Sequence, residues 1–165
     1  MTSTHDEMEA QQVFEHEIER WREKLFLDPI WKFKLEVLED DELGHAAAVD
    51  LSRSEYYSAR IIVSKSQLAL KGKALQETAS HVVCHELLHV LTIDYQHAAL
   101  APMTNNAPMR KELRYRYEQL MSRLTEVLLN LDSVGEDNEP TSGEDTGTPD
   151  EMLRVPEVPT GGEDG

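Results

Sequence analysis

One segment of the chain, His85-Glu86-Leu87-Leu88-His89, has the residue types and the spacing of a metal site that does chemistry. Residues four apart lie on one face of an α-helix, so the imidazoles of His85 and His89 can bind a single ion. Glu86 lies about 100° around the helix from His85, where its carboxylate can reach a water on the metal rather than the metal itself. The motif therefore predicts zinc-assisted hydrolysis with Glu86 as the general base.

A catalytic zinc ion usually has three protein ligands and leaves its fourth position to water, so the motif needs one more residue. His97 and several glutamates follow it in the sequence. On a helix over residues 109–131, Glu118 lies at the edge of the apolar face, where a side chain can reach a buried ion. Glu126 lies further from that face, and Glu112 lies on its opposite flank. We predict Glu118 as the third ligand, with Glu126 and His97 as the alternatives.

The other polar side chains near the motif have simpler explanations. His81 stands one helical turn earlier and is expected to support the site or to be an ordinary, partly buried histidine. Cys84 is expected to fill the core. Tyr115 and Tyr117 could each donate a hydrogen bond to an oxyanion, but packing is the preferred role for both. His45 has no evident partner and is expected at the surface.

The motif lies in a long apolar segment, residues 73–92, that is predicted to form a buried helix. Apolar residues cover nearly every face of this segment, which is typical of a helix packed on all sides. Polar side chains on such a helix need partners, because burying them alone costs several kcal/mol. A metal ion would be the partner of the two histidines; contacts with neighbouring side chains are the alternative without a metal.

The remaining patterns predict the elements that must position this helix. A helical repeat of apolar residues ends at Asp28-Pro29, because proline interrupts the helical hydrogen bonds. Three runs with strand character follow, the first with strict alternation of apolar and charged residues. We predict an α+β fold with one three-stranded, mostly antiparallel sheet. The expected elements are a helix over 6–27, strands over 31–37, 46–51 and 59–63, the motif helix over 73–92, a loop over 95–108 and a last helix over 109–131.

The composition is strongly acidic, with 32 Asp and Glu against 16 Lys and Arg and a formal net charge of -16. Such a chain lacks the positive surface that nucleic acids and anionic membranes require, so we expect neither as a partner. Cys84 is the single cysteine, so no internal disulfide can form and a reducing compartment is expected. The first residues lack the basic and apolar parts of a signal peptide. The expected location is the cytoplasm.

The charge is concentrated at the C-terminal end, where residues 132–165 contain eleven acidic residues and one basic residue. This segment has too few apolar residues to offset the entropy of ordering, so a disordered acidic tail is expected. Residues 152–156 form a short apolar island within it that could dock to a partner. Residues 1–131 are expected to form the single folded domain.

In its layout the chain resembles the small gluzincin-like zinc metallopeptidases of bacteria, archaea and phages. The similarity covers roughly residues 10–131: a helix, three strands, the buried motif helix and a following glutamate helix. The resemblance implies a small zincin-like domain whose edge strand nearest the metal helix, here residues 59–63, binds extended substrate. It also implies zinc bound by His85, His89 and a residue of the last helix, with Glu86 as the catalytic glutamate.

The expected function is zinc-dependent hydrolysis of a peptide or protein substrate, in a protein of phage or prophage type. A regulatory protease that acts on one partner would share this chemistry. A zinc-stabilised binding or regulatory module without hydrolytic activity is the alternative, because a domain this small leaves little wall around the metal.

Overall fold

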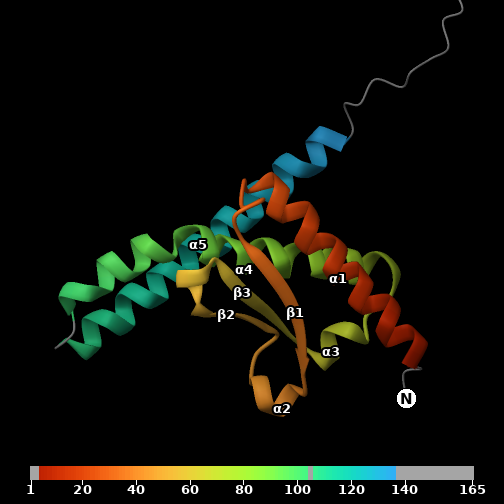
Figure 1. Ribbon diagram of the computed structural model, residues 1–165, viewed down its shortest axis with the longest axis horizontal. Helices are drawn as coiled ribbons and strands as arrows, with labels where there is room; N and C mark the ends of the chain where they lie inside the picture. The colour runs from red at the N-terminus through yellow and green to blue at the C-terminus, as the bar shows by residue number, and fades with distance from the viewer. Residues whose placement is uncertain (1–3, 104–105, 137–165) are drawn as a thin grey trace, which may run out of the picture.

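The computed structural model describes residues 4–103 and 106–136 of the chain (Figure 1). It confirms the α+β class, with five α-helices and one three-stranded sheet in the described residues. Its elements are α1 (Thr4–Lys24), β1 (Lys32–Leu38), α2 (Asp40–Leu43), β2 (Ala47–Arg53), β3 (Ser58–Ser64), α3 (Lys65–Leu68), α4 (Gly72–Leu100) and α5 (Ala107–Glu136), with short 3-10 turns at Ser54–Tyr56 and Ala101–Met103.

The sheet has the strand order β1-β3-β2, and its pairing differs from the prediction. β3 pairs antiparallel with β2 but parallel with β1, so the sheet is mixed rather than mostly antiparallel. β3 is also the central strand, although residues 59–63 were expected at the edge nearest the metal helix. The residues Ala59, Ile61 and Val63 of β3 are buried in the core, and Ile62 on the other face is partly covered, so the run over 61–63 lacks the polar residues that would mark an edge strand.

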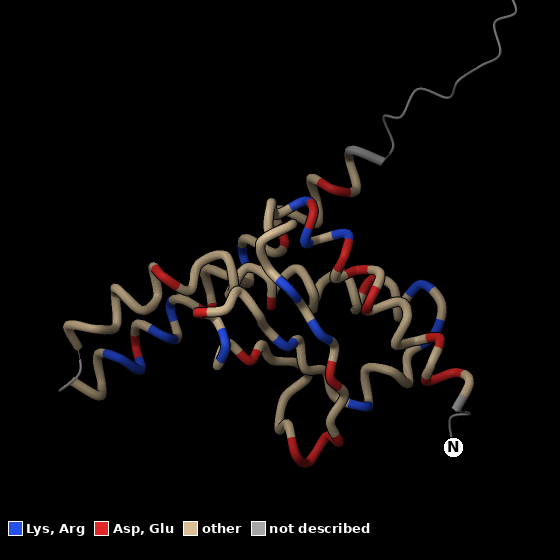
Figure 2. Tube along the Cα trace, viewed as in Figure 1, with Lys and Arg blue, Asp and Glu red and all other residues tan. Residues whose placement is uncertain are grey.

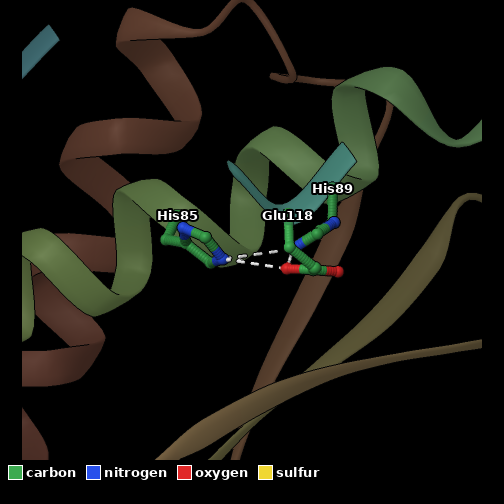
Figure 3. Close-up of side chains that lie close together, drawn as sticks. All are labelled: His85, His89 and Glu118. Carbon is green, nitrogen blue, oxygen red and sulfur yellow. Dashed lines mark hydrogen bonds and ion pairs between the residues drawn. The ribbon is translucent and has the colours of Figure 1, made fainter. Parts of the chain in front are cut away.

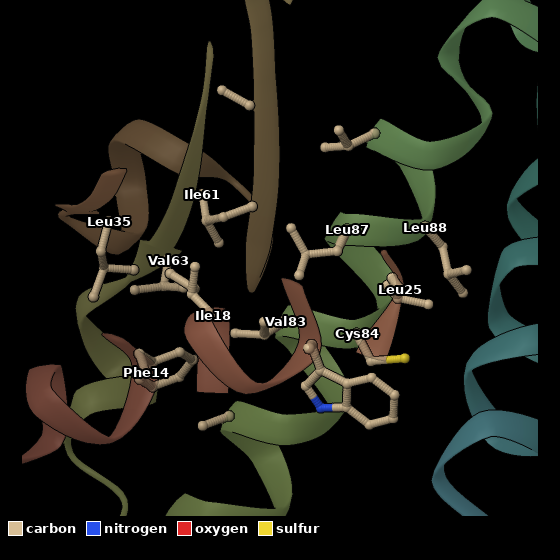
Figure 4. Packing of buried hydrophobic residues seen from close by; sticks show 14 of the residues in the cluster. Phe14, Ile18, Leu25, Leu35, Ile61, Val63, Val83, Cys84, Leu87 and Leu88 are labelled. Atoms are coloured by element: carbon tan, nitrogen blue, oxygen red, sulfur yellow. The ribbon is translucent and has the colours of Figure 1, made fainter. Parts of the chain in front are cut away.

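The core lies between one face of the sheet and two helices, α1 and α4 (Figure 4). Phe14 and Ile18 of α1 meet Ile61 and Val63 of β3, and all four are at most 3% exposed. The motif helix α4 adds Val83, Leu87 and other side chains to this cluster. The burial of α4 agrees with the prediction from its apolar sequence. The packing of these side chains fixes the rotation of α4 about its own axis.

A buried polar contact joins α1 to α4 and α5. The Oγ of Ser80 accepts hydrogen bonds from the indole nitrogen of Trp21, at 3.0 Å, and from the Arg20 guanidinium, at 2.9 Å. The same guanidinium and the Lys24 ammonium pair with Asp132 of α5. Three helices that are far apart in sequence are thereby tied together beside the core.

The long helices α4 and α5 form a hairpin that extends beyond the sheet, at the left of Figure 1. The predicted loop over 95–108 is wrong in its first part, because α4 continues to Leu100. Residues 95–100 contain no helix-breaking residue, and Pro108 stands in the first turn of α5, where proline is tolerated.

The last helix α5 runs on to Glu136 instead of ending near residue 131. Asp132, expected in the acidic tail, belongs to this helix and contacts α1. The rest of that predicted tail, with its apolar island at 152–156, lies outside the described residues. No helix in the described part of the chain is long and apolar enough to cross a membrane.

Candidate metal centre

The structure brings together the three side chains predicted as ligands, His85 and His89 of α4 and Glu118 of α5 (Figure 3). The two histidine Nε2 atoms are 3.2 Å apart. Glu118 Oε2 lies 3.6 Å from Nε2 of His85 and 3.4 Å from Nε2 of His89. The three atoms form a nearly equilateral triangle, and this group could hold a metal ion.

The separations of these three atoms are close to those between the ligand atoms of a tetrahedral metal ion. A tetrahedral ion with bonds of about 2.0–2.1 Å has ligand atoms about 3.3–3.4 Å apart. The three measured separations, 3.2, 3.4 and 3.6 Å, lie around that value. One ion can therefore contact all three side chains with little movement of any of them.

The hairpin arrangement explains why Glu118 reaches the histidines. Met121 and Thr125 of α5 are almost fully buried against the rest of the protein, which sets the rotation of that helix. Glu118 comes one turn before Met121 and is 55% exposed, so it lies at the mouth of the site. The histidine side chains are only 18% and 12% exposed and form its floor.

The two alternative ligands lie elsewhere. Glu126 pairs with His81 at 3.3 Å, and both side chains are exposed. His97 is exposed near the end of α4 and is not part of the group. Both residues are thus outside the triangle that Glu118 completes.

Burial favours the neutral form of His85 and His89. The pKa of His85 is lowered, first by removal of the ring from water and then by the neighbouring His89. The pKa of His89 is lowered by the same desolvation, although the Glu118 carboxylate opposes the shift. Neutral imidazoles have a free nitrogen lone pair at neutral pH, which metal binding requires.

Glu86 is a buried carboxyl group, 7% exposed, in the same cleft. Desolvation raises its pKa to about 7, and the Glu118 charge acts in the same direction. A backbone hydrogen bond from Val49 of β2 partly opposes this shift. A carboxyl group with a pKa near 7 can both accept and release a proton under neutral conditions.

The cleft around the site has a volume of about 420 Å³ and lies between the hairpin and β2. Ala47, Val49 and Leu51 of β2 line one side, and the central strand β3 does not reach it. The strand expected to border the metal was therefore the wrong one, and β2 takes that place. His45, expected to be an ordinary surface residue, also lines this cleft.

Sequence reasoning missed Thr125, which is fully buried beside His85. Its Oγ1 donates a hydrogen bond to the backbone oxygen of Met121, at 2.9 Å, as expected for threonine in a helix. A hydroxyl has one proton, so toward His85 Nδ1, 3.4 Å away, the same oxygen acts as the acceptor. This contact favours the tautomer with its proton on Nδ1 and leaves Nε2 free to bind an ion.

Tyr117 and Cys84 take the packing roles expected of them, whereas Tyr115 does not. The hydroxyl of Tyr117 pairs with Thr92, and its ring packs on His89 with centroids 5.5 Å apart. Tyr115 is exposed and accepts a hydrogen bond from Gln119. Cys84 is buried in the core, and desolvation raises the pKa of its thiol to about 12.

Comparison with known proteins adds no relative of this chain. No family model matches the sequence, and no curated protein or solved structure is significantly similar to it. The functional argument therefore rests on the site itself.

Proposed function

We propose that this protein is a zinc-dependent metallopeptidase with a zincin-like fold. The observation that carries the proposal is the triangle of His85, His89 and Glu118 with the buried carboxyl of Glu86 in the same cleft. Two neutral nitrogen ligands, one carboxylate ligand and a separate proton acceptor are the parts that zinc hydrolases share.

The donor set favours zinc over the hard divalent cations. Calcium and magnesium prefer oxygen ligands, whereas imidazole nitrogen with one carboxylate suits zinc. The nearly tetrahedral spacing of the three donor atoms supports the same choice. Three protein ligands also leave one position open for chemistry.

Glu86 is the residue that moves protons in the proposed reaction. When bound, a zinc ion makes a water acidic and polarises the scissile carbonyl group. The Glu86 carboxylate takes a proton from the attacking water as the new C–O bond forms. It then delivers that proton to the amine nitrogen as the C–N bond breaks, and returns to its starting state.

The outer edge of β2 is the proposed binding place for an extended peptide. Val49 bonds Glu86 through its backbone, so this edge of the strand faces the site. Ala47 and Leu51, two residues away on either side, point their backbone groups in the same direction and line the cleft. A peptide that pairs with this edge would be held through its main chain, with little dependence on sequence.

The test is metal content by mass spectrometry, followed by cleavage assays on a mixed peptide library. Wild-type protein should contain about one zinc per chain, and Glu118→Ala should lose or weaken it. Glu126→Ala is the matched control, an exposed glutamate two turns along the same helix, and should retain zinc. Glu86→Gln should retain zinc and lose hydrolysis.

Three results would contradict parts of this proposal. Wild-type protein that binds no zinc when zinc is offered would end it. Cleavage that survives Glu86→Gln would remove the proposed role of Glu86. Zinc bound through the three ligands without cleavage of any peptide would indicate a metal-stabilised binding module.

A further inference from the structure

The metal cleft extends along α4 beyond the metal group. Its lining includes Gln96 as well as His85, His89 and Glu118. Gln96 comes seven residues after His89 and eleven after His85. At about 100° per residue it lies within about 20° of both histidines, on the same face of the helix. The cleft therefore continues along α4 from the metal group to the side chain of Gln96.

The side chain of Gln96 is half-buried, and its amide faces the metal cleft. Gln96 also borders a groove of about 330 Å³ between α4 and α5. That groove exposes only apolar atoms, so the nitrogen and oxygen of the Gln96 amide lie on the cleft side. Within the residues that the structure describes, this amide makes no hydrogen bond or ion pair. Its donor and acceptor are therefore available to a ligand in the cleft.

The surroundings of Gln96 favour an uncharged ligand. Among the described residues that line the cleft, Glu86 and Glu118 are the only acidic ones, and none is a lysine or arginine. On α4 after His89, Asp94 is the one charged residue (Figure 2), and it lies about 160° around the helix from Gln96. β2 lines the opposite wall with apolar residues, Ala47, Ala48, Val49 and Leu51. A neutral amide between such walls suits a peptide main chain better than a charged side chain.

An extended peptide on the edge of β2 would present main-chain groups to this amide. Along a strand, residues that exchange hydrogen bonds with one neighbouring strand alternate with residues whose N–H and C=O groups point the other way. Because the cleft lies between β2 and the hairpin, those other groups face α4 and α5. The Gln96 amide has an acceptor oxygen and an NH₂ donor, so it can bond both the N–H and the C=O of one such residue.

The distance along α4 shows which residue of the peptide that is. Seven residues of α-helix, from His89 to Gln96, are about 10.5 Å long at 1.5 Å per residue. An extended peptide that follows the cleft covers this length in about three residues. Gln96 therefore meets the peptide about three residues from the bond that lies beside the metal group.

We propose that Gln96 is a substrate-positioning residue, which bonds the main chain of an extended peptide about three residues from the scissile bond. This inference rests on the proposed peptidase function and adds a substrate class to it. The substrates are extended segments that continue for about three residues or more on one side of the cleaved bond. Peptides that end before they reach Gln96 are poor substrates.

Peptide binding to the full chain, in its zinc-loaded Glu86→Gln form, tests this inference without cleavage. The probes are neutral peptides of alanine, serine and threonine, lengthened one residue at a time from about three to about ten residues. NMR titration gives the dissociation constant of each. Affinity should rise about tenfold at the length that reaches Gln96. Adding Gln96→Leu, which has a similar size and no amide, should abolish that rise and leave the binding of shorter peptides unchanged.

N-methylation of a single peptide bond gives a readout that altered packing would not give. A methyl group at the position that meets Gln96 removes the donor of one proposed hydrogen bond. It should weaken binding about tenfold when Gln96 is present and have no effect in Gln96→Leu. The matched control is His97→Ala, at the next and exposed position of α4, which should retain the length dependence. Zinc content should be the same in all of these proteins.

Three results would overturn the inference. One is an affinity that does not depend on peptide length, and another is a length dependence that survives Gln96→Leu. The third is a zinc-loaded protein that binds none of the peptides. Failure of the peptidase proposal is a different result, because the wild-type protein would then bind the longer peptides through Gln96 and leave them uncleaved.

Discussion

The hydroxyl of Thr125 determines which ring nitrogen of His85 is free of a proton at the proposed metal site. Free histidine presents its lone pair on either ring nitrogen, but a site needs it on the nitrogen that faces the ion. Because Thr125 accepts from Nδ1 while donating to the helix backbone, Nε2 of His85 faces Glu118 without a proton. The buried side chain of Thr125 thereby prepares His85 as one proposed ligand of the site.

Replacing Thr125 with valine tests this role. Valine has nearly the same shape but removes the acceptor of the Nδ1 proton of His85. The free energy of unfolding without metal should therefore fall by about 1–3 kcal/mol. Zinc affinity, measured by competition with a chelator, should fall about 10- to 100-fold. Nitrogen NMR of the metal-free protein should show the His85 proton moving toward Nε2.

Serine at the same position is the control for that experiment. Thr125→Ser retains the hydroxyl and should keep both the wild-type tautomer and most of the zinc affinity. An unchanged tautomer and affinity in Thr125→Val would show that packing alone orients His85.

The carboxyl group of Glu86 makes stability depend on pH when no metal is bound. Its pKa rises from 4.5 in the unfolded chain to about 7 in the folded protein. Between these values the folded state holds a proton that the unfolded state has released, so stability falls as pH rises through this window. Above about pH 7 the stabilising contribution of the Glu86 proton is lost completely.

Glu86→Gln removes this titration and retains an acceptor for the backbone of Val49. With a chelator present, the variant should gain about 2–3 kcal/mol in unfolding free energy relative to wild type between about pH 5 and pH 8. Urea denaturation at the two pH values measures the difference. Equal pH dependence in both proteins would mean that Glu86 is ionised freely in the folded state.

At the scale of elements, the contact around Ser80 holds α1 against the motif helix. Ser80→Ala leaves the indole N–H of Trp21 without its acceptor at a position where that ring is 2% exposed. An unpaired buried donor lowers the free energy of unfolding by about 1–3 kcal/mol. Urea denaturation should show this loss, whereas Ser133→Ala at an exposed position of α5 should change stability by less than about 0.5 kcal/mol. A wild-type value for Ser80→Ala would mean that water replaces the serine.

Periodicity was enough to predict the three strands and the long helices, because each has a regular apolar pattern of its own. Strand order was harder to predict. β1 pairs directly with β3, although β2 lies between them in the sequence, and no local pattern shows which strands become neighbours. The apolar run of β3 was the one local sign of a central strand. The end of α4 was predicted too early. The prolines at 102 and 108 indicated a turn in this region, but the helix continues to Leu100 before that turn begins.

For the site, helical geometry was sufficient to expect Glu118 beside the two histidines, because its position borders the buried face of α5. It could not find Thr125 or His45. Nothing in the sequence sets the relative height of α4 and α5, which brings Thr125 beside His85. His45 lies just before β2, so it lines the cleft because β2 is the strand at that edge of the sheet.

At the scale of the whole molecule, the proposed metal ion would link α4 and α5, the two helices of the hairpin. Ligands from α4 and α5 exist as a set only in the folded protein, so zinc should stabilise it by mass action. A free zinc concentration one hundred times the dissociation constant contributes about 2.7 kcal/mol. For a domain of this size the melting temperature should rise by roughly 5–15 °C.

Differential scanning calorimetry with zinc and then with a chelator measures this shift. His89→Ala should melt at the same temperature in both conditions, and Glu126→Ala should behave as wild type. An equal rise in His89→Ala would place the stabilising zinc at some other part of the protein.

The position of β2 at the rim of the sheet also bears on how the protein behaves at high concentration. Apart from its contact with Glu86, the outer side of β2 pairs with no strand in the part of the chain that the structure describes. Such an edge accepts any extended chain, including a misfolded neighbour, and can seed fibrous aggregates. The charge of -16 opposes this, because crowded copies repel one another until salt screens them. The acidity of the chain thus reduces the risk of aggregation through the open edge of β2.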